Sequence, residues 1–411
     1  MRGFSRWIGI GAAAGLIFAL VPVVRGDIAL EGALRKLAPR AEKANAGPNL
    51  DGLDLTRLDM RPRRVLAPLS DGRHAELTLD PVIQRAALSE MKKYRVPEAG
   101  VVVADVKTGN LLAYASYVNE GAKFDVNARA EPPAASVFKV ITSAALVEKA
   151  GLNHKTEQCY RGGRSRIMAD ELQEDPSRDK WCATLAMAMG RSLNVVFGRL
   201  AQKHLTPEDV TAMGGAFGFG APVPFAIANE APTIEIPNDP LEFARASAGF
   251  WHTTLSPLAA MTIAQSVANG GVALEPRLVA SVHRGKEKLW EETREPTVLR
   301  RSVKPETAAE LTQMMIQTTQ NGSAFKSFHD TRGRPFLPDI TVAGKTGTLT
   351  KYKANRHYTW FIGFAPANKP EVAISALVVN TPTWRIKGPE LARNVLRAYF
   401  AKKGAKGVTP P

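Results

Sequence analysis

The sequence predicts a mixed α/β fold in which an antiparallel sheet is flanked by helices and joined to a mostly helical subdomain, after an N-terminal transmembrane helix. Strand-like runs rich in Val, Ile, Leu and aromatic residues occur towards both ends of the chain, and helical patterns fill its middle. This order favours one sheet built from distant segments, with a helical insertion. The 411 residues, of which 45% are hydrophobic, suffice for such a core.

An uncharged N-terminal run predicts the transmembrane helix. Arg2 and Arg6 precede residues 7–24, which carry no charge, and eighteen helical residues span about 27 Å, close to the thickness of a bilayer core. A cleaved signal peptide is the alternative, but its apolar region is usually shorter and ends in a small-x-small site. We expect residues 1–25 to be an uncleaved anchor in the inner membrane. The basic end should lie in the cytoplasm and the remainder in the periplasm or another extracytoplasmic space.

The elements of the folded body follow in order. Residues 26–75 hold Gly, Pro and Arg without a sustained period, and we expect a juxtamembrane linker there. Asp80-Pro81 is a helix-start signal, and the turn 107–110 lies between two short runs typical of a hairpin. The body should cover residues 76–403, before a tail over 404–411. The expected helices are 81–94, 136–150, 183–203, 254–269, 305–320 and 390–402; the expected strands are 100–105, 110–116, 340–349, 359–364 and 372–379.

The charge of the chain is strongly basic. Lys and Arg number 54 against 39 Asp and Glu, for a net charge of +15. Such a balance suits nucleic acid, an anionic membrane surface or an acidic polymer. The sequence has no zinc-finger spacing, RNP-type aromatic motif or Walker loop. We therefore expect a cell-wall polymer or anionic lipid as the partner, and no nucleic acid.

Cys159 and Cys182 are the only cysteines. An exported chain would place them in a compartment where thiols can be oxidised. The residues between them are typical of turns, so a local disulfide is one interpretation. Two separate buried thiols are the other.

A first motif, Ser136-Val-Phe-Lys139, is a candidate nucleophile and base. The same spacing begins at Ser89, Ser177 and Ser323, so spacing alone indicates little. Ser136 differs because two prolines precede it and an apolar run follows. This context places it near the start of a buried helix, where free backbone N–H groups favour negative charge. Residues three apart share a helical face, so Lys139 can reach the serine and accept its proton if burial or a second cation lowers its pKa.

A second motif, Ser192-Leu-Asn194, follows a predicted helix break at Gly190. A hydroxyl and an amide at this spacing could both point into a cleft. The serine could then relay a proton while the asparagine holds a substrate amide. Taken alone, the motif is typical of an ordinary loop.

A third motif, Lys345-Thr346-Gly347-Thr348, ends an apolar strand. Period-two alternation puts the two threonines on one face and the lysine on the other, and the glycine should leave room for a substrate backbone. Two hydroxyls near a cation suit a carboxylate, and Lys345 could be the second cation beside Lys139. The backbone N–H groups of Ser136 and Thr348 could form an oxyanion hole.

Together, the motifs resemble those of the active-site serine penicillin-recognising enzymes, and the chain is similar to the transpeptidase domain of penicillin-binding proteins. The similarity extends over roughly residues 76–400, because five further segments match: 79–84, 104–109, 254–258, 268–271 and 360–366. It implies a penicillin-binding-protein transpeptidase or serine β-lactamase-like fold.

The resemblance implies a role for each motif residue. Ser136 would attack the carbonyl of a D-alanyl-D-alanine stem peptide of peptidoglycan and release the terminal D-alanine, and β-lactams would acylate it as substrate mimics. Lys139 would be the general base and Ser192 the proton relay. Asn194 would contact the substrate amide and Lys139. The substrate carboxylate would be bound by Lys345, Thr346 and Thr348. No metal or organic cofactor is implied.

Three functions remain open at this point. The first is a D,D-transpeptidase in peptidoglycan biosynthesis, with other cell-wall synthesis proteins as possible partners. The second is a D,D-carboxypeptidase or β-lactam hydrolase that forms the same acyl-enzyme, and the third is a non-catalytic, membrane-anchored scaffold or β-lactam sensor. The chain lacks the Glu-Asp-x-x-Phe signature of a glycosyltransferase domain, and Ala134-Ala135 replaces the Pro-Gly often found before the serine. We expect a transpeptidase domain on a short tether.

Overall fold

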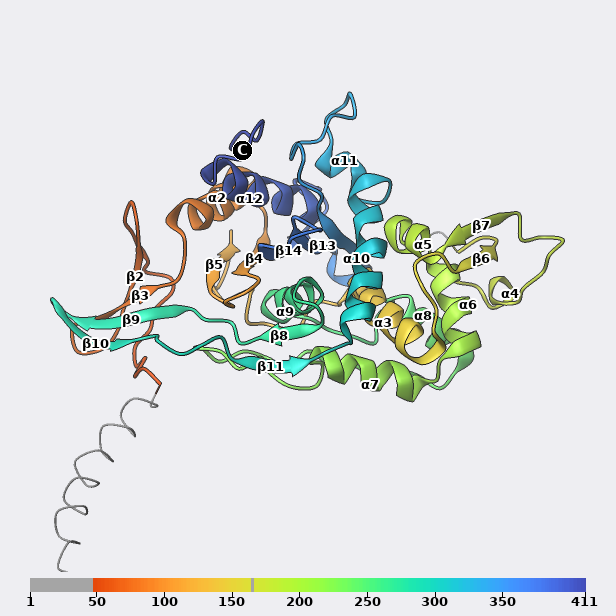
Figure 1. Cartoon of the computed structure of the whole chain (residues 1–411), viewed down its shortest axis with the longest axis horizontal. Helices are drawn as coiled ribbons and strands as arrows, with labels where there is room; N and C mark the ends of the chain where they lie inside the picture. Colours follow the sequence, from red (N-terminus) through yellow and green to blue (C-terminus); the bar gives the residue numbers. More distant parts are fainter. Residues whose placement is uncertain (1–46, 164–165) are drawn as a thin grey trace, which may run out of the picture. The chain divides into compact units, whose positions relative to one another are not determined.

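A five-stranded antiparallel sheet forms the centre of the unit Leu50–Pro411, with strand order β12-β13-β14-β4-β5 (Figure 1). The predicted sheet built from distant segments is confirmed, because β4 pairs with β14 and places Asp105 opposite Val372. The strands are β4 (Glu98–Asp105), β5 (Leu111–Val118), β12 (Ala343–Lys351), β13 (Arg356–Ala365) and β14 (Val372–Asn380).

The computed structural model describes residues 47–163 and 166–411. The predicted transmembrane helix over residues 7–24 lies outside these residues. Within them, no helix combines the length and the apolar character that crossing a bilayer requires.

Side chains of β4 alternate between two hydrophobic cores. Val101 and Val103 face the core beneath α2 (Pro81–Lys93) and α12 (Gly388–Lys402). Val102 faces the other core, which contains α9 (Pro257–Ala268), so helices cover both faces of the sheet (Figure 1). A strand that is buried on both faces needs a continuous apolar run, which explains the sequence of β4.

Most of the helices in the described part of the chain lie between β5 and β12, as predicted. The expected helix over 183–203 is interrupted, however, because Ser192 adopts a left-handed φ of 59° and ends one helix before the next begins. The expected helix over 136–150 opens with the 3-10 turn η1 (Ala135–Phe138). The α-helices are α3 (Lys139–Ala150), α4 (Ala169–Leu172), α5 (Leu185–Arg191), α6 (Asn194–His204), α7 (Pro207–Phe217), α8 (Pro240–Ser247), α10 (Pro305–Gln320) and α11 (Phe325–Phe328).

A disulfide joins Cys159 and Cys182. These residues lie opposite each other on the paired strands β6 (Glu157–Tyr160) and β7 (Trp181–Thr184). The structure therefore contains a local disulfide and not two separate thiols. Just before β7, the carboxylate of Asp179 accepts hydrogen bonds from Arg161 at 2.8 Å and from Arg199 of α6 at 2.6 Å, which ties this hairpin region to the helices.

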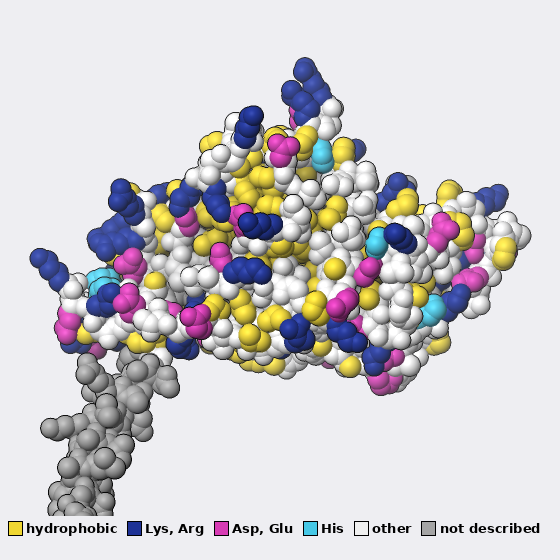
Figure 2. All heavy atoms as spheres, in the orientation of Figure 1, with side chains coloured by type: hydrophobic (Ala, Val, Ile, Leu, Met, Phe, Trp, Pro, Cys, Tyr) yellow, Lys and Arg dark blue, Asp and Glu magenta, His cyan; other side chains and the backbone are white. Residues whose placement is uncertain are grey.

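A second five-stranded sheet lies outside the predicted elements. Its order is β1-β2-β3-β9-β10, and Figure 2 shows Lys and Arg side chains gathered where β2, β3, β9 and β10 lie, with histidine and some acidic side chains among them. Val65, Ala67 and Ala75 of this sheet are buried in the core, so residues 50–75, expected to be linker, belong to the folded unit. The strands are β1 (Asp59–Met60), β2 (Val65–Pro68), β3 (Arg73–Leu77), β9 (Val279–Arg284) and β10 (Glu287–Glu291); β8 (Val272–Leu274) and β11 (Val298–Arg301) form a separate pair.

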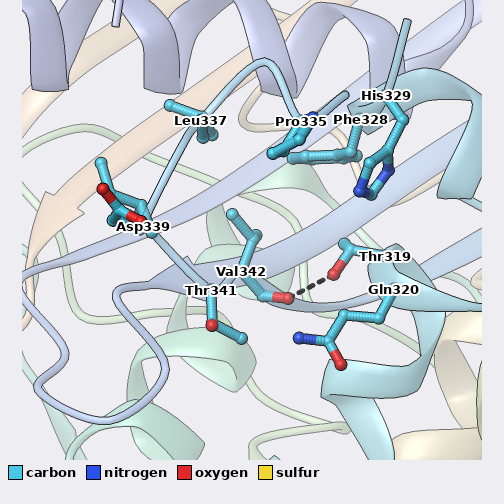
Figure 3. Close-up of a pocket in the computed structure, with 10 residues that line it drawn as sticks. Thr319, Gln320, Phe328, His329, Pro335, Leu337, Asp339, Thr341 and Val342 are labelled. Carbon is cyan, nitrogen blue, oxygen red and sulfur yellow. Dashed lines mark hydrogen bonds between the residues drawn. The ribbon is translucent and has the colours of Figure 1, made fainter. Parts of the chain in front are cut away.

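The segment that leads into β12 is held by α10. Thr319 donates a hydrogen bond to the carbonyl of Val342 at 2.6 Å beside a cavity of about 250 Å³ (Figure 3). The carbonyl of Thr341 accepts from the N–H of Ala367 at 2.8 Å. The strand β12 itself begins at Ala343 and not at residue 340 as predicted.

Candidate active site

Ser136 lies in the turn η1, directly before α3. The chain ahead of it is fixed by two hydrogen bonds: the N–H of Ala134 donates to the carbonyl of Thr253 at 3.1 Å, and the indole of Trp360 donates to the carbonyl of Pro133 at 2.9 Å. Ala135 has a φ of 52°, in the left-handed region that non-glycine residues rarely adopt. A strained residue therefore presents the hydroxyl of Ser136, and neighbouring strands and loops hold it in place.

Two glycines let other segments approach this turn. A Cβ atom on Gly249 would lie 2.3 Å from the carbonyl oxygen of Ala135 and 3.0 Å from the Cα of Ser136. A Cβ atom on Gly347 would lie 3.2 Å from the Cβ of Ala135. Gly347 thus packs against the turn that carries Ser136. That it also leaves room for a substrate backbone stays a prediction.

Lys139 is fully buried beneath Ser136. Its Nζ lies 3.0 Å from the Ser136 Oγ and 2.8 Å from the Oδ1 of Asn194, and it also donates to the carbonyl of Ala248. Two of the three partners can only accept a hydrogen bond from it, whereas the serine hydroxyl can accept or donate. A neutral amine has two hydrogens and one lone pair, so it satisfies all three partners when the serine donates. The protonated amine satisfies them by donating three hydrogen bonds.

The pKa of Lys139 lies well below its ordinary value. Burial is the larger cause, because a fully buried ammonium loses its hydration, and the charge of Lys345 adds to the effect. Burial and the neighbouring cation therefore both favour the neutral form of the amine. Lys139 can then act as a base towards the hydroxyl 3.0 Å away.

Lys345 is the second buried lysine of the site. Its Nζ donates to the Oγ of Ser192 and to the backbone carbonyl of Thr346, both at 2.9 Å, and burial lowers its pKa to about 7. Alternation predicts that it lies on the opposite face from Thr346 and Thr348. It still reaches Ser192, because β12 is an edge strand and a long side chain can pass around that edge.

A cleft of about 560 Å³ brings most of the predicted residues together. Lys139 and Lys345 are buried below it, and Arg191, Phe250, Trp251 and Tyr352, none of which the motifs indicate, also line it. The predicted residues that line the cleft are Ser136, Ser192, Asn194, Thr346 and Thr348.

Ser323 is a further residue of the cleft that the sequence prediction missed. Its Oγ lies 2.6 Å from the Oγ1 of Thr346, and its N–H donates to the carbonyl of Gly190 at 2.8 Å. It therefore joins the third motif to the helix break before Ser192. Ser323 opens one of the four Ser-x-x-Lys pairs of the sequence, but nothing in its spacing indicates that it lies in the same cleft as Ser136.

No cluster of three or more His, Cys, Asp or Glu side chains that could hold a metal ion occurs in residues 47–163 and 166–411. The chemistry that this cleft can perform rests on hydroxyl, amine, amide and backbone N–H groups. A serine next to a lysine that can lose its proton defines a class of serine enzymes in which an amine takes the place of histidine as the base.

The comparison with known families identifies the group within this class: the chain belongs to the penicillin binding protein transpeptidase domain family, whose sequence model matches residues 99–400. The peptidoglycan D,D-transpeptidase PbpA of Mycobacterium tuberculosis is 29% identical over 347 residues, covering 75% of this chain and 68% of that protein.

Solved structures agree with this assignment. The D,D-transpeptidase domain of a peptidoglycan glycosyltransferase from Eggerthella lenta superposes with a TM-score of 0.66 at 25% identity, covering 80% of this chain and 83% of that one. Penicillin-binding protein A from M. tuberculosis, in its penicillin G acyl-enzyme complex, superposes with a TM-score of 0.64 at 25% identity and covers 80% of each chain. The expected family and its mixed α/β fold are thus confirmed.

Proposed function

We propose that the protein is a peptidoglycan D,D-transpeptidase that cross-links stem peptides through an acyl-enzyme on Ser136. The contact between Ser136 and the buried amine of Lys139, at 3.0 Å, carries this proposal. The names of the relatives support it, because M. tuberculosis PbpA is a peptidoglycan D,D-transpeptidase and penicillin-binding protein A of that organism forms an acyl-enzyme with penicillin G.

Acylation begins when Lys139 accepts the proton of the Ser136 hydroxyl. The serine oxygen attacks the carbonyl between the two D-alanines, and the carbonyl oxygen takes the negative charge. We assign the stabilisation of this charge to the backbone N–H groups of Ser136 and Thr348. The carbonyl of Thr346 accepts a hydrogen bond from Lys345 within the site, so the backbone groups of Thr346 point away from β13. Backbone groups two residues apart in a strand point the same way, which supports an N–H of Thr348 that faces the site.

Departure of the terminal D-alanine needs a proton on its nitrogen. Ser192 is the proposed relay, because its hydroxyl accepts from Lys345, whose pKa of about 7 allows it to lose and regain a proton. The hydroxyls of Thr346 and Thr348 and the charge of Lys345 would hold the carboxylate of that D-alanine. An amine of a neighbouring stem peptide then attacks the acyl-enzyme and forms the cross-link. Its proton passes through Ser192 back to Lys345, and Lys139 returns the proton that it accepted to the Ser136 oxygen.

The location of the enzyme is part of the same proposal. Residues 1–25 would anchor the chain in the inner membrane with the catalytic unit in the periplasm, where peptidoglycan and other wall-synthesis proteins are accessible. The uncharged run over residues 7–24 supports this placement.

Labelling by a fluorescent penicillin tests the nucleophile. We expect covalent labelling of the wild type and none of Ser136→Ala. Ser89→Ala is the matched control, because Ser89 also opens a Ser-x-x-Lys sequence but is exposed on α2 and donates to the carbonyl of Ala86. Labelling that persists in Ser136→Ala would refute the assignment, and a folded wild type that never reacts would favour the scaffold function.

Products made from purified stem-peptide substrates test the fate of the acyl-enzyme. Cross-linked products support the transpeptidase. Trimmed products without cross-links would instead establish a D,D-carboxypeptidase, and rapid recovery from penicillin labelling would establish a β-lactam hydrolase.

A further inference from the structure

A second concave site lies on the sheet β1-β2-β3-β9-β10. It is a cleft of about 760 Å³. Its lining comes from β1, β2 and the segments next to them, from the start of β3, and from the end of β9 with the turn that follows it. The active-site cleft has a different set of lining residues, so the two are separate.

The lining of this cleft is strongly cationic. It contains one carboxylate, that of Asp59, and five cationic side chains: Arg57, Arg61, Arg64, Arg73 and Lys286. Asp59 accepts from Arg61 at 2.8 Å, and Glu76 lies 3.7 Å from Arg64. Within residues 47–163 and 166–411, Arg57 and Lys286 form no ion pair at salt-bridge distance. The charge of Arg57 acts on Asp54, which does not line the cleft, so the lining keeps an excess of positive charge.

Two histidines lie in the middle of these cations. His74 and His283 face each other across β3 and β9, with ring centroids 5.3 Å apart and planes 10° apart. Burial lowers the pKa of His74, and the charges of His283, Arg61 and Arg64 lower it further. The cationic surroundings thus disfavour an additional positive charge, which a bound anion would reverse.

The floor of the cleft is apolar and its rim is exposed and cationic. Leu66 is 6% exposed at the base, whereas the side chains of Arg61 and Arg64 are each 47% exposed at the edge. Guanidinium groups match phosphate oxygens in pairs. A phosphate with attached carbon atoms therefore fits this arrangement better than a bare inorganic ion.

We propose that this cleft binds the phosphate groups of anionic phospholipids. The proposal rests on the membrane anchor of the proposed function, because Arg57 follows residues 1–25 after only a short connector in the sequence. The cleft would hold the catalytic unit against an anionic bilayer surface, and the net charge of +15 would contribute long-range attraction.

Hydrogen exchange of the full chain on vesicles tests the proposal. The vesicles contain phosphatidylcholine alone or with phosphatidylglycerol. We expect phosphatidylglycerol to slow amide exchange in residues 57–76 by about fivefold or more. A factor of about five corresponds to the attraction of one Lys or Arg side chain to an anionic surface. Arg57→Ala combined with Lys286→Ala should abolish the slowing, and neither change leaves a carboxylate without its ion-pair partner.

Two controls distinguish binding in the cleft from general charge attraction and from capture of free phosphate. Arg332→Ala with Lys369→Ala also removes two exposed cations, neither of which lines the cleft, and it should retain the slowing. Inorganic phosphate added to phosphatidylcholine vesicles should have no effect. Equal slowing by inorganic phosphate, an equal loss in both double variants, or no slowing by phosphatidylglycerol would each overturn the proposal.

Failure of the proposed function gives a different result. Flotation of the chain with phosphatidylcholine vesicles measures the anchor, and penicillin labelling measures Ser136. Both should be unchanged in Arg57→Ala with Lys286→Ala. Exchange that slows only with phosphatidylglycerol supports the cleft even if labelling fails.

Discussion

Gly249→Ala should damage the active site without touching any reactive group. The φ of Gly249 is 83°, and a left-handed conformation costs an L-residue roughly 1–2 kcal/mol. The new Cβ would also lie 2.3 Å from the Ala135 carbonyl oxygen, which is closer than van der Waals contact. Because this oxygen belongs to the backbone, it cannot move aside as a flexible side chain could. Overpacking of this kind costs about 1–3 kcal/mol, so the two effects together should lower the free energy of unfolding by about 2–5 kcal/mol.

The same change should slow acylation. The overlap is relieved only if the segment that carries Ala135 and Ser136 moves away from Gly249, and Lys139 does not move with it because Asn194 and the carbonyl of Ala248 hold its amine. A misplacement on the order of 1 Å can reduce a rate about 100-fold. We expect the second-order rate of labelling by fluorescent penicillin to fall by about 10- to 100-fold.

Gly215→Ala is the matched control. Gly215 lies in α7, and a Cβ atom there would meet nothing within 4 Å. The substitution should raise the free energy of unfolding by about 0.5–1 kcal/mol, because alanine favours the helix, and should leave acylation unchanged. The reasoning is refuted if Gly249→Ala reacts within twofold of the wild-type rate, or if urea denaturation finds it as stable as Gly215→Ala.

Three other contacts give measurable expectations. The pKa of Lys345 falls from 10.5 to about 7 on folding, so between these pH values this lysine binds fewer protons in the folded than in the unfolded state. The free energy of unfolding should therefore rise with pH in that window. Urea denaturation at pH 7 and 9 measures the rise, which Lys345→Met should flatten. Ser323→Ala removes the partner of Thr346 and should slow penicillin labelling about two- to tenfold, the value of one hydrogen bond. Ser323→Thr should keep the rate, and equal rates in all three proteins would contradict this role. Trp360→Phe leaves the carbonyl of Pro133 without its donor and should cost about 1–3 kcal/mol of unfolding free energy; an unchanged value would show that the contact is dispensable.

The central sheet could be predicted because its signal is local. Strands β4 and β14 in its interior are buried on both faces, so each is a nearly continuous apolar run. The resemblance of the chain to a known family supported the arrangement of the strands. The segment containing Ser136 could be located for a similar reason: an apolar run follows it and prolines precede it. Helix α10 has the predicted bounds, residues 305–320, because a proline starts it and an asparagine follows it.

The second sheet could not be predicted because its strands are short and their partners are distant. β3 is held on one side by β9, some two hundred residues away in the sequence, where Ala75 pairs with Val282. Polar side chains such as His74 and Glu76 interrupt the apolar pattern of β3. Ser323 and Gly249 escaped prediction for a related reason: their importance depends on contacts made across the cleft, which no local pattern encodes.

The pairing of β14 with β4 has a consequence for how the enzyme is made. Asp105 and Val372 lie opposite each other, so the central sheet closes only after the chain has been synthesised through β14. A nascent chain that ends at residue 350 already contains every side chain of the three motifs, but β12 then lacks its partner β13. Long-range strand pairing of this kind slows folding. Reactivity towards penicillin should therefore appear last during biogenesis, which makes it a direct assay for completion of the fold.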